Sequence, residues 1–178
     1  METQKFRVES AQSNIDWTGK KVTGAHNGTI DIKGGEITTV DGLLKGGNFV
    51  IDTTSIKILD ITDPGTNAQF AGHLFSDDFF STERYPEATF VMTSVDHLTN
   101  SNYRITGDLT IKSITHAVTF PANALISNGI VTASGRIVVD RTNYEMKFRS
   151  GNFFTNLGDT LIYNEFELDV KLTASATI

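Results

Sequence analysis

The sequence contains no cysteine, which excludes disulfides, iron–sulfur clusters, thiolate zinc sites and a cysteine nucleophile. Long hydrophobic runs are also missing, because no stretch approaches the roughly 20 apolar residues of a membrane-spanning helix. We therefore expect no integral membrane segment. The N-terminus, METQKFRVES, lacks the apolar core of a secretory signal. This predicts a cytoplasmic protein, or a periplasmic one if a native signal peptide precedes this sequence and is removed.

Positive charge is in short supply as well. The 15 lysines and arginines are outnumbered by 21 aspartates and glutamates, giving a net charge of −6. Nucleic-acid binding needs basic stripes that displace counterions from the phosphate backbone. The acidic balance therefore predicts that nucleic acid is not a partner.

The sequence also lacks the motifs of common catalytic and metal sites. There is no HExxH, GxSxG, phosphate loop or dinucleotide fingerprint. The four histidines, at positions 26, 73, 97 and 116, are not spaced as metal ligands along one element. We therefore predict no catalytic residue, no metal and no cofactor. For His73 two interpretations stay open, a structural partner of buried backbone or of Asp77, or a polar group at the mouth of a pocket.

Alternation of apolar and polar residues dominates what is present. Residues 165–172 alternate without error, and residues 103–111 place every second side chain on one face, as half-buried antiparallel strands do. The pattern predicts about eight to ten strands, separated by turns that include Gly34-Gly35, Asp41-Gly42, Gly46-Gly47 and Asn128-Gly129. We expect one all-β domain over residues 1–178, either a sandwich or a barrel. An inward glycine such as Gly107 would leave room inside a barrel.

Two segments interrupt the strands, and each carries a pair of phenylalanines. Residues 60–86 contain the predicted helices, at 68–74 and 77–80, with Asp77 and Asp78 expected to cap the second one. Residues 146–159 contain Phe153 and Phe154, which resemble the Phe79-Phe80 pair. Phenylalanines outside strands either line a cavity or plug one end of the core, and both interpretations stay open.

A locally basic stretch stands out in the acidic chain. It consists of Arg136, Arg141, Lys147 and Arg149, with Asp140 and Glu145 among them. Cross-strand ion pairs on the surface are one interpretation. The alternative places Arg141 or Arg149 at a cavity mouth, where a guanidinium would contact an anionic head group.

An ordered series of short segments resembles the YceI-like family, which includes polyisoprenoid-binding proteins. The segments are VESA (8–11), SNIDWTG (13–19), GNFVID (47–52), SI (55–56), HL (73–74), DFF (78–80), YP (85–86), TF (89–90), ITGDLTI (105–111), THAVTF (115–120) and VDRTNY (139–144). The resemblance runs from about residue 6 to residue 173.

The resemblance implies an extended antiparallel lipocalin-like β-barrel of about eight strands, with a short helical insert near residues 66–82 that covers one end. It also implies an apolar interior that holds a polyisoprenoid, an isoprenoid quinone or a similar lipid, and a homodimer. The residues expected to contact this ligand are Trp17, Phe49, Ile51, His73, Phe75, Phe79, Phe80, Phe90, Ile105, Leu109, Arg141, Phe153 and Phe154.

The sequence therefore predicts a non-catalytic protein that binds or carries a small-molecule lipid. One alternative is an enzyme that acts on a lipid-like or amide substrate in the same cavity, with His73 or His116 beside a carboxylate. Another is a structural or interaction module whose barrel is filled by its own side chains.

Overall fold

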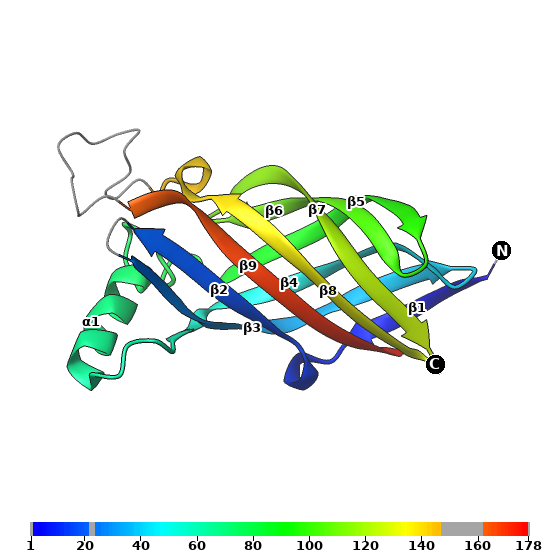
Figure 1. Cartoon of the computed structure of the whole chain (residues 1–178), viewed down its shortest axis with the longest axis horizontal. Coiled ribbons are helices and arrows are strands. Elements are labelled where there is room, and N and C mark those ends of the chain that lie inside the picture. Colours follow the sequence, from blue (N-terminus) through cyan, green and yellow to red (C-terminus); the bar gives the residue numbers. More distant parts are fainter. Residues whose placement is uncertain (1, 22–23, 147–161, 178) are drawn as a thin grey trace.

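A computed structural model describes residues 2–21, 24–146 and 162–177. Nine antiparallel strands form one sheet that curls into an elongated barrel (Figure 1). The strands are β1 (Thr3–Val8), β2 (Asn14–Lys21), β3 (Gly24–Val40), β4 (Leu43–Ile58), β5 (Glu87–Thr99), β6 (Asn102–Ile111), β7 (Ile114–Ser127), β8 (Ile130–Asp140) and β9 (Ile162–Ala176). The helices are α1 (Pro64–Phe75) and the 3-10 turns η1 (Ser10–Gln12) and η2 (Arg141–Tyr144). The predicted lipocalin-like barrel with one helical insert is confirmed.

The barrel closes because β2 lies between β3 and β9, while β3 also pairs with β4. β1 also pairs with both β3 and β9, farther along the barrel. β1 and β2 therefore act together as a single strand of the barrel wall. The break between them falls at η1. There the hydroxyl of Ser13 accepts a hydrogen bond from the backbone N–H of Thr173 (2.9 Å) and restores the connection to β9.

Two of the predicted turns are wrong, because Gly34-Gly35 lies within β3 and Gly46-Gly47 within β4. These strands approach so closely that a Cβ on Gly35 would lie 2.2 Å from the carbonyl oxygen of Asn48. Glycine therefore allows two bent strands to approach closely here and does not mark a chain reversal. The turns predicted at Asp41-Gly42 and Asn128-Gly129 do connect neighbouring strands.

The wall is incomplete between β7 and β8. The two strands pair only over residues 122–127 and 130–135, and Pro121, which has no N–H to donate, stands where this pairing ends. Beyond it a groove of about 340 Å³ separates the strands. η2 fills the inner side of this groove: Tyr144 is 1% exposed and its hydroxyl donates to the carbonyl oxygen of Leu109 (3.0 Å).

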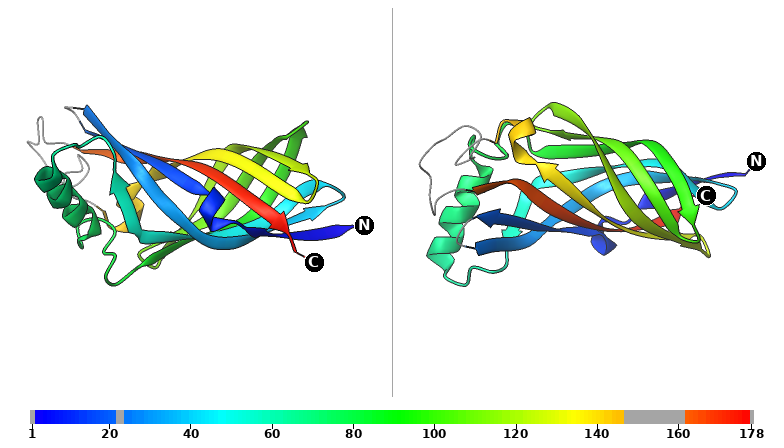
Figure 2. Two further views of the ribbon diagram at one scale, coloured as in Figure 1. Left: turned by 90° about the horizontal axis from the view of Figure 1, so that it is seen from below. Right: turned by 45° about the horizontal axis from the view of Figure 1, so that its top comes forward.

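One end of the barrel is covered by α1 (Figure 2). Asp63 caps the helix by accepting a hydrogen bond from the N–H of Thr66 (2.8 Å), and Pro64 occupies the first turn. None of the twelve residues of α1, all within the described part of the chain, is fully buried. The helix is therefore a cover over the barrel end and not a core element.

The second predicted helix, at residues 77–80, is wrong. This segment is a turn, in which the N–H of Phe79 donates to the oxygen of Ser76 and the N–H of Phe80 donates to that of Leu74 (both 3.0 Å). Asp77 does not cap a helix but accepts a hydrogen bond from the hydroxyl of Ser81 (2.6 Å). The turn brings Phe79 and Phe80 back against the core.

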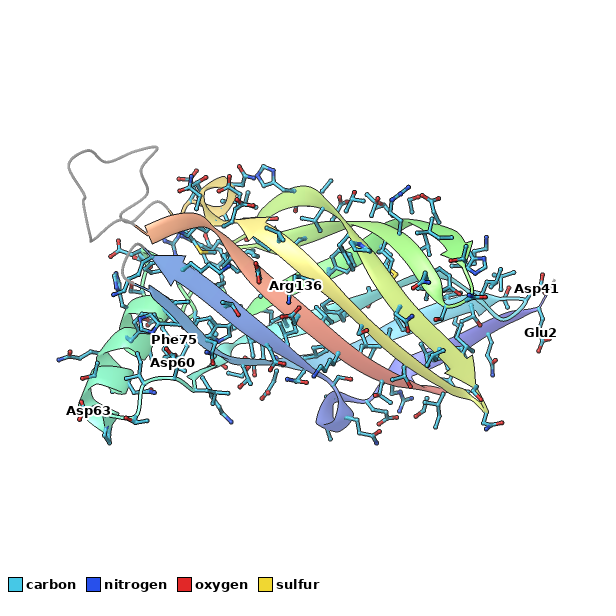
Figure 3. All side chains as sticks on the ribbon, in the orientation of Figure 1. Glu2, Asp41, Asp60, Asp63, Phe75 and Arg136 are labelled. Carbon is cyan, nitrogen blue, oxygen red and sulfur yellow. The ribbon has the colours of Figure 1, made fainter. Side chains whose placement is uncertain are left out.

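Figure 3 shows the two ends of the barrel, with Phe75, Asp60 and Asp63 at the α1 end and Glu2 and Asp41 at the opposite one. The backbone N–H of Glu2 donates to Asp41 (2.8 Å) at that far end. Within the ranges that the structure describes, no helix is long and apolar enough to span a bilayer.

Candidate functional site

A cavity of about 140 Å³ lies inside the barrel at the α1 end. Its walls come from every side, because β2, β3, β4, β5, β6, β9, α1 and η2 all contribute. The lining residues are Ile15, Trp17, Gly19, Lys20, Lys21, His26, Ile30, Ile51, Thr53, Ile56, Phe70, His73, Leu74, Phe79, Phe80, Ala88, Leu109, Ile111, Arg141, Met146, Glu165, Phe166 and Leu168. Most of these side chains are aliphatic or aromatic and a few are charged, a combination that suits an amphipathic ligand.

Aromatic side chains close the mouth. Phe79 and Phe80 reach it from the turn after α1, and Phe70 reaches it from α1 itself. The ring of Phe80 meets that of Phe166 on β9 edge-on at a centroid distance of 6.1 Å. The phenylalanine pair therefore lines the cavity and helps to close it. Phe75 does not line the cavity but packs, half-buried, against the core.

Trp17, the only tryptophan in the sequence, forms part of the cavity wall. Its indole nitrogen donates to the backbone carbonyl of Lys57 on β4 (3.1 Å). The ring lies against Gly28, where a Cβ would be 2.8 Å from the indole. The indole is thus fixed in the wall and can report on the cavity by its fluorescence.

Arg141 brings a charge into this apolar space. The residue is only 3% exposed, it donates to the carbonyl oxygen of Met146, and its guanidinium lies 5.7 Å from the ring centre of Phe79. Burial lowers the pKa of Arg141 to about 10, although the charge of Asp140 opposes this shift. The guanidinium is still protonated at neutral pH, so the cavity contains a buried cation.

Two more cations lie at the mouth, since Lys20 and Lys21 follow Trp17 along β2 and line the cavity. Lys20 is 3.7 Å from Glu167, and Glu165 is the carboxylate among the lining residues. With Arg141, the described part of the lining includes three basic residues and one acidic residue. Sequence reasoning missed both lysines, because adjacent lysines in an alternating strand resemble ordinary surface residues.

His73 also reaches the cavity, and its partner differs from the one expected. Its Nε2 lies 3.1 Å from a carboxylate oxygen of Asp78, and not of Asp77. The side chains of this pair are 37% and 55% exposed, so water reaches them. The ring of His73 meets Phe79 edge-on at 5.0 Å. The contact positions Phe79 at the mouth.

A second histidine pair joins α1 to the barrel, and the sequence did not reveal it. His26 Nδ1 on β3 lies 2.7 Å from Asp60, and its ring contacts Phe70 at 4.8 Å. Burial would raise the pKa of Asp60, but hydrogen bonds from the Asn27 N–H and His26, together with the charge of His26, hold it below its usual value. The pair could not be predicted from the sequence because 34 residues separate His26 from Asp60.

Lys112, in the β6–β7 turn, connects the two elements that carry Phe79 and Arg141. Its ammonium donates to the backbone oxygens of Asp77 (3.3 Å) and Glu145 (3.2 Å). Burial lowers the pKa of Lys112, and the charges of Asp77 and Glu145 work in the opposite direction. This side chain holds the mouth together without lining the cavity.

Besides Phe75, three of the predicted ligand-contacting residues lie away from the main cavity. Phe49, Phe90 and Ile105 line a smaller cavity of about 40 Å³ deeper in the barrel. The expectation that Gly107 leaves room inside is wrong, because the ring of Phe90 occupies that space and a Cβ on Gly107 would be 2.4 Å from it. By contrast, Trp17, Ile51, His73, Phe79, Phe80, Leu109 and Arg141 come together around the main cavity.

The residues of the predicted basic stretch lie in different places. Arg136, labelled in Figure 3, lies on β8 and pairs with Asp169 (2.8 Å) and Glu167 (3.8 Å) on β9, as the surface interpretation required. Arg141 lies in the cavity wall. Lys147, Arg149, Phe153 and Phe154 lie outside the described residues. Within the described ranges, no three histidine, aspartate or glutamate side chains are grouped as a metal site.

His116 bears on the enzyme alternative. Its Nε2 lies 3.0 Å from the backbone oxygen of Asn143, and its ring meets Tyr144 edge-on at 5.2 Å. The contact that the structure gives this histidine is therefore with a carbonyl group of η2 and not with a carboxylate. His116 holds η2 against the barrel wall.

Solved structures share this architecture. Burkholderia cenocepacia BcnA superposes with a TM-score of 0.75 over 94% of this chain and 99% of its own, at 20% identity. A polyisoprenoid binding domain from Saccharophagus degradans, implicated in plant cell wall breakdown, gives a TM-score of 0.67 over 99% of this chain and 100% of its own, at 14% identity. At these identities the likeness concerns the fold.

Sequence comparison identifies the family. Protein YceI of Escherichia coli O157:H7 is 35% identical over 111 residues, which are 62% of this chain and 53% of that protein. A UPF0312 protein of Photorhabdus laumondii is 36% identical over 111 residues, 62% of this chain and 55% of that protein. The matched region thus spans about half the length of these relatives. The model of the YceI-like domain matches residues 6–174, and the chain therefore belongs to the YceI-like family.

Proposed function

We propose that this protein binds a lipid whose apolar tail enters the main cavity and whose anionic end lies near Arg141. The observation that carries the proposal is a buried guanidinium in the wall of a cavity whose lining is mostly aliphatic and aromatic. A filled barrel would need neither the space nor the charge. The family and the polyisoprenoid-binding domain with the same fold support an isoprenoid as the ligand.

Burial of the tail would provide the affinity. Each methylene that leaves water contributes about 0.8 kcal/mol, and the aliphatic walls have few polar groups to desolvate. Orientation would come from charge, because among the described lining residues Arg141, Lys20 and Lys21 outnumber Glu165. A phosphate or diphosphate accepts hydrogen bonds from such a cluster, and a guanidinium is well shaped for it.

The cover formed by α1 provides a way in. The helix has no fully buried residue among Pro64–Phe75, every one of which the structure describes. Its link to β3 is the His26–Asp60 pair and the His26–Phe70 contact. The helix is also joined to β4, because the side chain of Asn67 donates to the carbonyl oxygen of Ile58 (2.9 Å), and Leu74 and Phe75 pack half-buried against the core. An element without a fully buried residue opens at a lower free-energy cost than the strands of the barrel core. The lipid would enter as α1 moves away from the barrel end.

The first test is native mass spectrometry of freshly purified protein, with organic extraction of whatever dissociates. The second is titration with geranyl diphosphate and with geraniol, followed by the fluorescence of Trp17. We expect both to bind and the diphosphate to bind more tightly. The double variant Lys20→Ala/Lys21→Ala should lower this preference for the diphosphate, whereas Arg136→Ala, outside the barrel, should not.

A protein that carries no lipid, and whose Trp17 fluorescence responds to neither compound, would overturn the proposal. Equal affinities for geraniol and geranyl diphosphate in all variants would support a site for the tail and contradict a site for the anion. The carrier role and the homodimer remain predictions. Lipid exchange between vesicles tests the former, and light scattering after size exclusion tests the latter.

A further inference from the structure

The interior of the barrel is divided and does not form one continuous channel. Among the described residues, the main cavity and the deeper cavity have no lining residue in common. The strand register shows where the two linings meet: Leu109 lines the main cavity, and Phe90, its partner on β5, lines the deeper one. Other buried side chains at this level pair with lining residues, Ile15 with Val170, Ile32 with Ile51 and Ile137 with Leu168. We call these five side chains, each at most 1% exposed, the layer: Ile15, Ile32, Phe90, Leu109 and Ile137.

Phe90 is the largest member of this layer, and its ring is held on three sides. The ring centres of Phe49 and Phe120 lie 5.2 and 5.6 Å away. On β6, Gly107 provides the surface on which the ring rests, because any Cβ there would lie 2.4 Å from its Cζ. A ring held this closely has little freedom to move aside for a ligand.

Packing against glycine recurs one strand pair farther on. Phe120 lies against Gly135 on β8, where a Cβ would be 3.1 Å from the ring. Phe120 borders the deeper cavity, as Phe90 does, but it is not part of the separating layer. The two residues therefore form a matched pair: removing either ring enlarges the deeper cavity, and only the removal of Phe90 opens the layer.

We infer that Phe90 is the floor of the lipid site and sets the length of tail that the protein accepts. The inference rests on the proposed function and names its ligand class: a short, branched isoprenoid tail with an anionic end. A dry cavity of about 150 Å³ accommodates benzene, so a cavity of about 140 Å³ accepts about one or two isoprene units. The remainder of a longer tail stays above the floor, in contact with α1 or with water.

The experiment is a chain-length series on the full chain. The dissociation constants of dimethylallyl, geranyl, farnesyl and geranylgeranyl diphosphate are measured through Trp17 fluorescence and by calorimetry, below the concentration at which each compound forms micelles. For the wild-type protein, affinity should rise at least about tenfold from dimethylallyl to geranyl diphosphate. It should then change less than about threefold for the two longer compounds.

Two variants locate the floor. Phe90→Ala should move the limit, so that geranylgeranyl diphosphate binds at least about tenfold more tightly than geranyl diphosphate. Phe120→Ala should keep the wild-type dependence on length. Thermal unfolding identifies a variant that does not fold, and Phe90→Leu, which removes less volume, then replaces Phe90→Ala.

The outcomes separate this inference from the proposed function. If affinity for the wild-type protein keeps rising through geranylgeranyl diphosphate, the floor does not exist, although the lipid site does. If Phe120→Ala moves the limit as much as Phe90→Ala does, the floor is not at Phe90. If no compound binds at any length, the inference falls together with the proposed function. The wild-type series alone decides between the first and last of these results.

Discussion

Ionisation of Tyr144 should lower the free energy of unfolding of this protein at alkaline pH. The variant Tyr144→Phe should lack this loss. The hydroxyl is buried and donates to the carbonyl oxygen of Leu109 (3.0 Å). At neutral pH, replacing it with hydrogen should cost about 1 kcal/mol, the usual net value of one buried hydrogen bond. In a domain of this length, that lowers the melting temperature by about 2–4 °C.

The effect should reverse at high pH. Burial raises the pKa of Tyr144 from 10.0 to about 12. A group whose pKa is raised by folding contributes stability that is fully present below pH 10 and is lost as the pH rises toward 12. The loss relative to neutral pH is about 1.4 kcal/mol at pH 11 and about 2.3 kcal/mol at pH 12. The wild-type protein and Tyr144→Phe should therefore be about equally stable near pH 11, and the variant should be the more stable one above it.

Urea unfolding followed by far-ultraviolet circular dichroism, at half-unit intervals from pH 7 to pH 11.5, measures this difference. The other ionising groups contribute equally to both proteins and cancel. A difference that stays constant across the whole range would refute the reasoning, because it would mean that Tyr144 is solvated and ionises normally. In that case η2 would not seal the gap between β7 and β8.

Three further predictions concern other parts of the molecule. Ile32→Ala, in the layer below the cavity, should destabilise the protein by about 2–5 kcal/mol in urea unfolding; a smaller loss would show that the layer collapses easily. Arg136→Ala should leave the melting temperature unchanged, since its ion pairs lie on the outer surface, and a drop of several degrees would contradict this. Below pH 3.8 the lowered pKa of Asp60 predicts loss of its contact with His26. Amide exchange in α1 should then rise relative to the barrel, and Asp60→Asn should exchange rapidly at neutral pH as well.

The alternation of apolar and polar residues was enough to predict most of the fold. Residues 165–172 and 103–111 predicted strands because one face of each is buried against the interior, and the structure has β9 and β6 there. The two glycine pairs misled for a physical reason. Glycine marks both a reversing turn and a close contact between bent strands, and only the partner strand distinguishes them. For Gly35 the paired residue on β4 is Phe49, and the close carbonyl oxygen belongs to its neighbour Asn48.

The site was harder to predict than the fold. Phe79, Trp17 and Leu109 line one cavity because turns and strands from distant parts of the sequence converge there. The spacing of these residues in the sequence does not indicate that they converge. Period-two patterns identify an inward face but not its depth along the barrel, and depth is what separates Ile51, which lines the main cavity, from Phe49, which lines the deeper one.

The arrangement of the first and last strands governs when this barrel can be complete. β9 lies between β8 on one side and β1 and β2 on the other, so the wall has a gap until residues 162–176 are available. During synthesis on the ribosome, the cavity, α1 and η2 would all emerge before their enclosure exists. Contacts of such long sequence separation favour slow folding, and the aromatic residues of the cavity would stay open to chaperones until β9 joins the sheet. Under the proposed function, lipid loading would therefore follow the end of translation of this domain.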